Sequence, residues 1–134
     1  MKIVDRLFIL KQRCSLKIDE LSAETGLTPR EMRALESLSI GETVSGNEIS
    51  RRMELSPSRG SRIVESLIRK GCLLRETNPF DRRAIHLSLS EHGAGQKRKI
   101  ETLKNDCEKL LRSHISGDQI DRVCESLEIL MKAW

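Results

Sequence analysis

The fold of this chain is decided by the stretch Leu55-Ser56-Pro57-Ser58-Arg59-Gly60-Ser61-Arg62. Ser56 has the side chain of a helix N-cap and Pro57 suits the first helical position, so this stretch opens a helix. Gly71 suits the left-handed conformation that follows a helix, so we expect the helix to end just before it. A shorter helix capped by Ser45 precedes it after a tight connection. Two helices joined by so short a turn form a helix-turn-helix.

The first turns of the helix that starts at Ser56 carry hydroxyl and guanidinium groups that can bind nucleic acid. Recognition helices read base edges mainly with their N-terminal residues. Arginine can bridge guanine O6 and N7, a contact worth about 1–3 kcal/mol of discrimination, and serine hydroxyls suit phosphate oxygens. We expect the DNA contacts of this helix to come from Ser56, Ser58, Arg59, Ser61 and Arg62. Gly60 would remove bulk in the first turn and so allow close approach to DNA.

Two short strands joined by a basic turn follow the helix-turn-helix. Cys72–Arg75 can form the first strand, and Ala84–Leu89 alternates apolar and polar residues as a half-buried second strand does. The residues between them have the composition of a turn. The hairpin is therefore a wing with Arg82 and Arg83 near its tip, where a narrow minor groove would attract them. Asp81 is placed to orient Arg83 through a charge-assisted hydrogen bond.

Positive charge is concentrated in the same segment. The chain has a net charge of +4, but residues 51–83 alone carry nine basic groups against four acidic groups, a net charge of +5. The basic residues are Arg51, Arg52, Arg59, Arg62, Arg69, Lys70, Arg75, Arg82 and Arg83. The acidic residues are Glu54, Glu65, Glu76 and Asp81. A focused basic surface indicates a polyanionic partner, and a merely solvated charged face is the alternative.

The residues before the helix-turn-helix are predicted to be helical. Apolar residues spaced by three or four predict a helix over about residues 2–24, which Gly26 ends. Thr28 and Pro29 then give an N-cap and a first helical residue for a second helix that ends at about residue 39. Glu31 is expected to complete a capping box at its start.

Two further helices are predicted after the wing, the first capped by Ser90 and the second by Ser116. The apolar stripes at both ends of the chain have no sheet or third layer to cover them, so a partner subunit is the natural solution. The predicted fold is mainly α with a small β-wing. A winged helix-turn-helix in residues 28–90 lies between a dimerisation helix in residues 1–27 and dimerisation helices in residues 91–134.

The spacing of cysteine and histidine argues against a metal site, a disulfide framework or an enzyme. The cysteines form no Cys-x-x-Cys pair and are Cys14, Cys72, Cys107 and Cys124. With neither a secretory signal nor a membrane-length apolar run, we expect a cytoplasmic chain with reduced thiols. The histidines lack paired ligand spacing and are His86, His92 and His114. The sequence therefore predicts no metal, no cofactor, no catalytic residues and no enzymatic activity.

Several motifs resemble those of the MarR family of winged-helix transcription regulators. They are Leu55-Ser56-Pro57, Leu67-Ile68-Arg69-Lys70-Gly71, Asp81-Arg82-Arg83-Ala84 and Leu87-Ser88-Leu89-Ser90-Glu91-His92-Gly93. The family pattern has Asp-x-Arg in the wing and then Leu-Thr-x-x-Gly, and this chain has Ser90 in place of the threonine. The resemblance covers roughly residues 28–95. It implies a homodimer joined by the first and last two helices, a palindromic operator read by the helix from Ser56, and minor-groove insertion of Arg83.

Members of the family often respond to small phenolic ligands or to oxidants. Cys14 lies on the first predicted helix, in the region where oxidant-sensing members carry a reactive cysteine. Those members activate it with nearby tyrosines, and this chain has no tyrosine. Because Cys14 also falls on the apolar stripe, we expect a buried structural thiol.

The sequence thus predicts a homodimeric regulator that binds double-stranded DNA sequence-specifically, acts as a repressor, and is released by a small-molecule effector or an oxidant. Release would follow from a change in the spacing of the two recognition helices. Two alternatives stay open, namely a winged-helix module that binds an acidic protein, and a thiol-based redox sensor that acts through Cys14.

Overall fold

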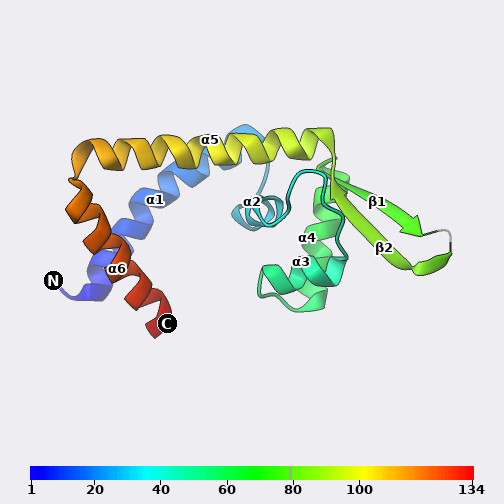
Figure 1. The fold of residues 1–134 in the computed structure, drawn as a ribbon, viewed down its shortest axis with the longest axis horizontal. Helices are drawn as coiled ribbons and strands as arrows, with labels where there is room; N and C mark the ends of the chain where they lie inside the picture. Colours follow the sequence, from blue (N-terminus) through cyan, green and yellow to red (C-terminus); the bar gives the residue numbers. More distant parts are fainter. Residues whose placement is uncertain (79) are drawn as a thin grey trace. The chain divides into compact units, whose positions relative to one another are not determined.

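The computed structural model describes residues 1–78 and 80–134, and for residues 78 and 81–84 it describes the backbone only. The elements in chain order (Figure 1) are α1 (Ile3–Thr25), α2 (Pro29–Glu36), α3 (Gly46–Arg52), α4 (Pro57–Arg69), β1 (Leu73–Asn78), β2 (Asp81–Leu89), α5 (Glu91–His114) and α6 (Gly117–Ala133). The chain divides into two compact units, Met1–Ile100 and Glu101–Trp134, so α5 begins in the first and ends in the second. A mainly helical fold with a small β-wing is thereby confirmed.

The helix boundaries follow the predicted capping residues. Thr28, Ser45 and Ser56 each accept a hydrogen bond from the backbone N–H three residues further on. Gly26 and Gly71 have φ values of 72° and 74°, in the left-handed region that glycine adopts without strain at the end of a helix. Ser116 and the residue three positions later form a complete capping box at the start of α6.

Two expectations about the early helices are corrected. Glu31 does not complete a capping box, because its carboxylate pairs with Lys70 instead. Glu48, three residues after the Ser45 cap, likewise pairs with basic side chains, those of Arg51 and Arg52. Helix α2 also ends at residue 36, about three residues earlier than predicted.

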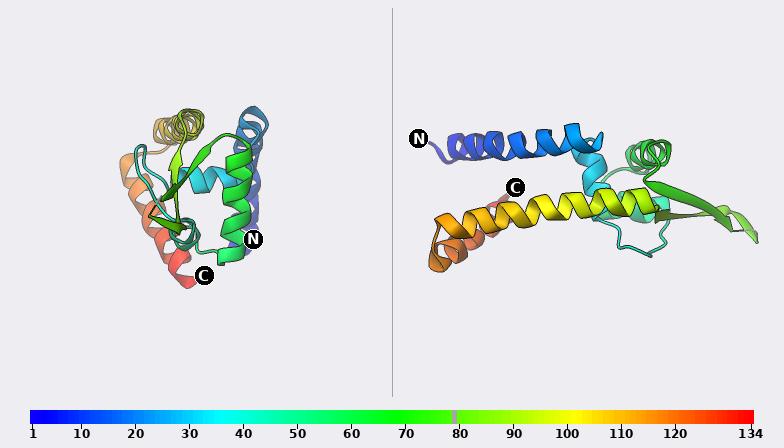
Figure 2. Two further views of the ribbon diagram at one scale, coloured as in Figure 1. Left: turned by 90° about the vertical axis from the view of Figure 1, so that its right-hand side faces the viewer. Right: turned by 90° about the horizontal axis from the view of Figure 1, so that it is seen from above.

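The two strands form an antiparallel hairpin that extends beyond the neighbouring helices of the same unit (Figure 2). Leu73 lies opposite Leu89, and the strands pair as far as the turn. They are longer than predicted, since β1 continues to residue 78 and β2 starts at residue 81 rather than 84. Val44, between α2 and α3, exchanges backbone hydrogen bonds of 2.9 and 2.7 Å with Leu87, which ties the base of the hairpin to the helix-turn-helix.

The core of the first unit is aliphatic, and its contributions come from every element between α2 and β2. The side chains with less than 2% exposure include Leu27, Leu35, Leu38, Ile49, Leu67 and Leu87. Val64 and Leu67 place one face of α4 in this core. Their burial fixes which face of α4 remains in solvent.

The start of α5 is held tightly against the end of the helix-turn-helix. The Ser90 hydroxyl accepts a hydrogen bond of 2.9 Å from the Gly93 N–H and donates one to the Gly71 carbonyl. The Ser90 N–H donates to the Cys72 carbonyl at 3.0 Å. A Cβ atom on Gly93 would lie 2.0 Å from that carbonyl oxygen. Ser90 and Gly93 therefore serve the same structural role, because both allow α5 to pack closely on residues 71–72.

Apolar side chains on α1 and in the second unit are largely in solvent within the single chain. On α1 the exposures reach 63% at Phe8 and 62% at Leu16, and helix α6 buries none of its residues. Cys14 on α1 is exposed, so the expectation that it is buried is wrong for the single chain. Cys72 is fully buried. No helix among the described residues is long and apolar enough to cross a membrane.

Candidate nucleic-acid interface

The first turns of α4 present the predicted polar residues to solvent. All five are exposed: Ser56, Ser58, Arg59, Ser61 and Arg62. The Ser56 hydroxyl is already used as the N-cap, since it accepts the Arg59 N–H at 3.3 Å and lies 3.3 Å from the Ser58 hydroxyl. Ser58, Arg59, Ser61 and Arg62 thus form the accessible polar face of the helix, while Ser56 fixes where the helix begins.

Gly60 has a different role from the one that its sequence position indicated. It is buried, and a Cβ atom placed on it would lie 1.8 Å from the Ser50 hydroxyl oxygen and 2.7 Å from the Ser50 Cβ. Gly60 therefore faces α3 rather than a DNA partner. Its missing side chain lets the two helices of the helix-turn-helix pack closely, which positions α4 relative to α3.

Gly60→Ala is expected to lower the free energy of unfolding by about 1–3 kcal/mol, because the added methyl overlaps Ser50. This loss outweighs the gain of roughly 1 kcal/mol that alanine brings to a helix interior. Urea denaturation measures the change, and Gly117→Ala is the control because its Cβ would meet no atom within 4 Å. Adding Ser50→Gly to Gly60→Ala should restore part of the loss, and no recovery would contradict this contact.

Most of the described positive charge in the segment is neutralised by ion pairs. Arg51, Arg52, Lys70 and Arg75 each pair with a glutamate, and three of those glutamates precede residue 51 in the chain. The net charge of +5 counted along the sequence therefore overstates the basic surface. Within the part of the chain that the structure describes, Arg59, Arg62 and Arg69 form no ion pair. The available charge of α4 thus lies on its exposed face.

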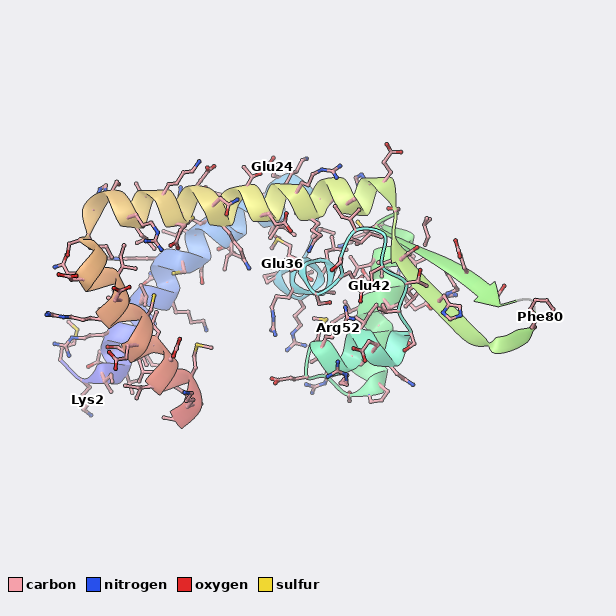
Figure 3. The ribbon with its side chains drawn as sticks, in the orientation of Figure 1. Lys2, Glu24, Glu36, Glu42, Arg52 and Phe80 are labelled. Atoms are coloured by element: carbon pink, nitrogen blue, oxygen red, sulfur yellow. The ribbon has the colours of Figure 1, made fainter. Side chains whose placement is uncertain are left out.

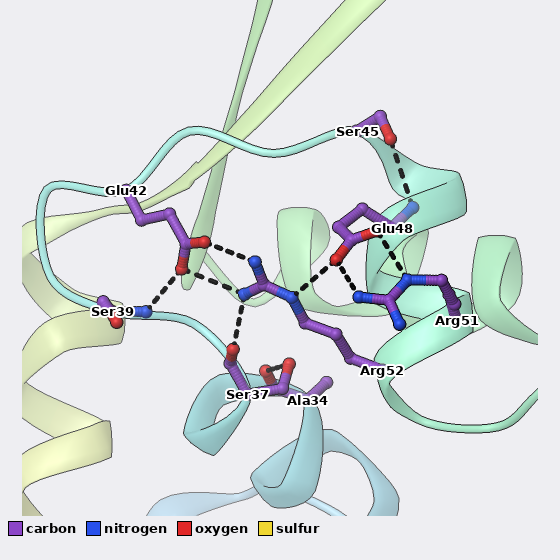
Figure 4. A network of polar contacts seen from close by, with 8 residues as sticks. All are labelled: Ala34, Ser37, Ser39, Glu42, Ser45, Glu48, Arg51 and Arg52. Carbon is purple, nitrogen blue, oxygen red and sulfur yellow. Dashed lines mark hydrogen bonds and ion pairs between the residues drawn. The ribbon is translucent and has the colours of Figure 1, made fainter.

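A network of ion pairs fixes the segment between α2 and α3 (Figure 4). Arg52 pairs with Glu42 and, at 3.1 Å, with Glu48, and it donates a hydrogen bond of 2.7 Å to the Ser37 carbonyl. Arg51 also binds Glu48. Hydrogen bonds from Arg52 lower the pKa of Glu42 to about 2, and hydrogen bonds from Arg51 and Arg52 lower the pKa of Glu48 to about 2.

These pKa values predict a loss of stability in acid. A carboxyl whose pKa falls on folding stabilises the folded state above its unfolded pKa, here 4.5, and this contribution is lost as the pH falls toward 2. Thermal unfolding between pH 5 and pH 2.5 should therefore show a smaller acid-induced decrease in Tm for the double variant Glu42→Gln/Glu48→Gln than for the unmodified chain. Glu24→Gln, at an exposed position on α1, is the control. Equal pH dependence in all three chains would contradict the proposed contribution of the network.

The wing residues are only partly described. The backbone of Asp81, Arg82 and Arg83 belongs to β2, but their side chains lie outside the described residues, so their predicted roles remain predictions. Figure 3 shows Phe80 at the tip of the hairpin, where its side chain is 97% exposed. The three histidines, His86, His92 and His114, are exposed. No group of three metal-ligating side chains occurs among the described residues.

One pair of residues was not singled out by sequence reasoning. Arg75 on β1 binds Glu65 on α4 and so connects the wing to that helix. The alternation of side chains along the strand could have indicated this contact. Arg75 is two residues from the buried Leu73 and lies opposite the buried Leu87, so all three are on the same face of the hairpin. An arginine on the inner face of a strand requires a partner, and α4 is the adjacent element.

Comparison with known proteins gives a consistent set of similarities. The sequence profile of the MarR family matches residues 25–84. The HTH-type transcriptional repressor MdtR of Bacillus subtilis (strain 168) is 33% identical over 84 residues, which are 63% of this chain and 54% of MdtR. The chain thus spans about half the length of this curated relative.

Solved structures resemble the whole chain. The YusO protein from Bacillus subtilis has a TM-score of 0.76 and 25% identity, with 98% of this chain and 94% of YusO covered. MepR of S. aureus in its complex with DNA has a TM-score of 0.71 and 15% identity, with 93% of this chain and 94% of that chain covered. The second likeness is a likeness of fold alone.

Proposed function

We infer that the chain belongs to the MarR family of winged-helix regulators, and we propose that it regulates transcription by binding double-stranded DNA sequence-specifically. The observation that carries the proposal is that Arg59 and Arg62, on the N-terminal half of α4, are exposed and form no ion pair with any side chain that the structure describes. Arginine at this position of a recognition helix can reach base edges in the major groove. The wing adds Arg82 and Arg83 as contacts to the neighbouring minor groove, with Asp81 orienting Arg83.

We further propose that the protein acts as a homodimer on a palindromic operator. The exposed apolar residues of α1 and α6 support this, because aliphatic helices of this length are marginal in water unless a partner covers them. Residues 1–27 and 91–134 would form the dimerisation helices, and residues 28–90 the DNA-binding domain. Two-fold symmetry would place the centres of the half-sites about 34–36 Å apart. Analytical ultracentrifugation tests the dimer, and a stable folded monomer at micromolar concentration would contradict it.

The proposal also covers the sign of regulation, which is repression, and the signal that releases the DNA. The relative MdtR is a transcriptional repressor, which supports repression here. A small-molecule effector or an oxidant would release the DNA by binding or modifying one dimer state in preference to the other. The exposure of Cys14 supports the alternative in which this thiol is the sensor. Mass spectrometry after mild peroxide should then find Cys14 oxidised, and an unmodified Cys14 would exclude that alternative.

Selection of bound sites from a random duplex library is the experiment that tests the proposed function. It should return one inverted repeat, and that repeat should compete for the protein far better than random duplex does. If no sequence is enriched while the protein binds an acidic protein partner, the alternative of a protein-binding winged helix is supported instead. Salt dependence alone does not separate the two, because both partners are polyanions.

Arg83→Ala is expected to weaken binding to the selected operator and to reduce the slope of log affinity against log salt by about 1, since one cation near phosphate is removed. Fluorescence anisotropy over a range of salt concentrations measures both quantities. Unchanged affinity and slope would refute the role of the wing while leaving the role of α4 intact.

A further inference from the structure

A hollow of about 310 Å³ lies between the recognition helix and the wing. Its lining includes the buried side chains of Val64 and Leu87, and its polar groups include Ser61 on α4 and Arg75 on β1. All of the lining residues belong to the first unit of the chain. The hollow is therefore a built feature of the winged helix-turn-helix.

The position of the hollow relates it to DNA if the proposed function is correct. With α4 in the major groove and the wing in the neighbouring minor groove, one sugar-phosphate strand separates the two grooves. That strand has to cross between α4 and the wing, and the hollow occupies this place. A phosphate there would meet polar groups from both elements.

The groups around the hollow suit a phosphate oxygen. A guanidinium has five N–H donors, and Arg75 uses its Nη2 to bind Glu65. The remaining donors can form charge-assisted hydrogen bonds to phosphate, and the hydroxyls of Ser45 and Ser61 can add neutral ones. Glu65 also lines the hollow, and its carboxylate opposes an anion there.

We propose that this hollow holds one phosphodiester group of the operator backbone, bound by Arg75 with Ser45 and Ser61, and that Glu65 positions the Arg75 guanidinium while weakening its attraction for phosphate. The occupant is the DNA strand between the two grooves. This inference rests on the proposed function, and it adds a contact that reports the shape of the duplex rather than its base sequence.

Substitution of the two partners of the ion pair should change DNA affinity in opposite directions. Arg75→Gln is expected to weaken binding to operator and to random duplex alike, by roughly ten-fold at low salt, and to reduce the salt slope by about 1. Glu65→Gln is expected to strengthen binding and to steepen the slope, because it removes a negative charge beside the phosphate. Arg98→Gln, at an exposed position on α5, is the charge-matched control. Since both variants at the ion pair break the same contact, a merely structural role predicts that both weaken binding.

Methylphosphonate linkages, which remove the charge of single phosphates, locate the contact. Each linkage of the selected operator is replaced in turn, and affinity is measured for the unmodified chain and for Arg75→Gln. One linkage per half-site, between the contacted major and minor grooves, should weaken binding by the unmodified chain and have no further effect on the variant. A thermal unfolding curve for each variant checks that the variant is folded at the temperature of the affinity measurements.

Three outcomes would overturn the inference. Arg75→Gln could keep the full salt slope, Glu65→Gln could weaken binding as Arg75→Gln does, or no linkage could couple to Arg75. Benzoate titrated without DNA tests whether the hollow binds a free organic anion. If Arg75→Gln abolishes benzoate binding but leaves the affinity for duplex DNA unchanged, the hollow is a site for a small ligand and not for the DNA backbone. A failure of the proposed function is distinguishable, because the unmodified chain would then select no operator.

Discussion

Gly93→Ala is expected to lower the free energy of unfolding by about 3 kcal/mol and Tm by roughly 10 °C. The added Cβ would lie 2.0 Å from the Cys72 carbonyl oxygen and 2.8 Å from its carbon, and both are backbone atoms. A flexible side chain could rotate away, but this carbonyl is held by the Ser90 N–H at 3.0 Å. Relief therefore requires α5 to shift from residues 71–72, which would also disturb the wing that begins at the next residue.

The matched control for Gly93→Ala lies two residues further along the same helix. A Cβ on Gly95 would come no closer than 3.9 Å, to an Arg98 nitrogen, so Gly95→Ala should be neutral or stabilise the chain by up to about 1 kcal/mol. Urea denaturation of the two variants compares one chemical change in two environments. Equal effects would show that the contact with Cys72 is not what requires glycine at residue 93.

The double variant Arg59→Ala/Arg62→Ala is expected to bind the selected operator roughly 10²–10⁴-fold more weakly than the unmodified chain. Each arginine that reaches a base edge is worth about 1–3 kcal/mol, and every 1.4 kcal/mol is ten-fold in affinity. Both side chains are exposed and unpaired among the described residues, so stability should change by less than about 0.5 kcal/mol. Loss of base contacts should reduce affinity for operator more than affinity for random duplex.

Removal of two positive charges elsewhere controls for net charge. Arg98 and Lys99 are exposed on α5, and Arg98→Ala/Lys99→Ala should reduce operator and random-duplex affinity only slightly and equally. Anisotropy at fixed salt with both duplexes measures the specificity ratio. If the α4 double variant kept the ratio of the unmodified chain, base readout by Arg59 and Arg62 would be refuted.

Features that depend on neighbouring residues were predictable from the sequence. The serine and threonine caps, the prolines at first helical positions and the glycines after α1 and α4 act over three or four residues, and each helix starts or stops where they indicate. Strand ends were predicted less well, because Asn78 and Asp81 are turn-forming residues that here continue the pairing.

Features that depend on contacts distant in sequence were not predictable. Gly60 looked like an opening toward DNA, yet the residue that requires its small size is Ser50, ten positions earlier on another helix. The basic segment looked more positive than it is, because Lys70 pairs with Glu31 across 39 residues. The exposure of Ser58, Arg59, Ser61 and Arg62 was predicted correctly, since the spacing of Val64 and Leu67 fixes the buried face of α4.

Helix α6 buries none of residues 117–133, all of which the structure describes, and this has a consequence for the abundance of the protein. A helix of 17 residues that fully buries none of them is marginal in water, so its order depends on what covers it. If a second copy does, folding of this end and association are one equilibrium that dilution shifts. A cell that makes few copies would then hold chains with a frayed C-terminus, open to proteolysis. The amount of regulator would in this way determine how long each copy survives.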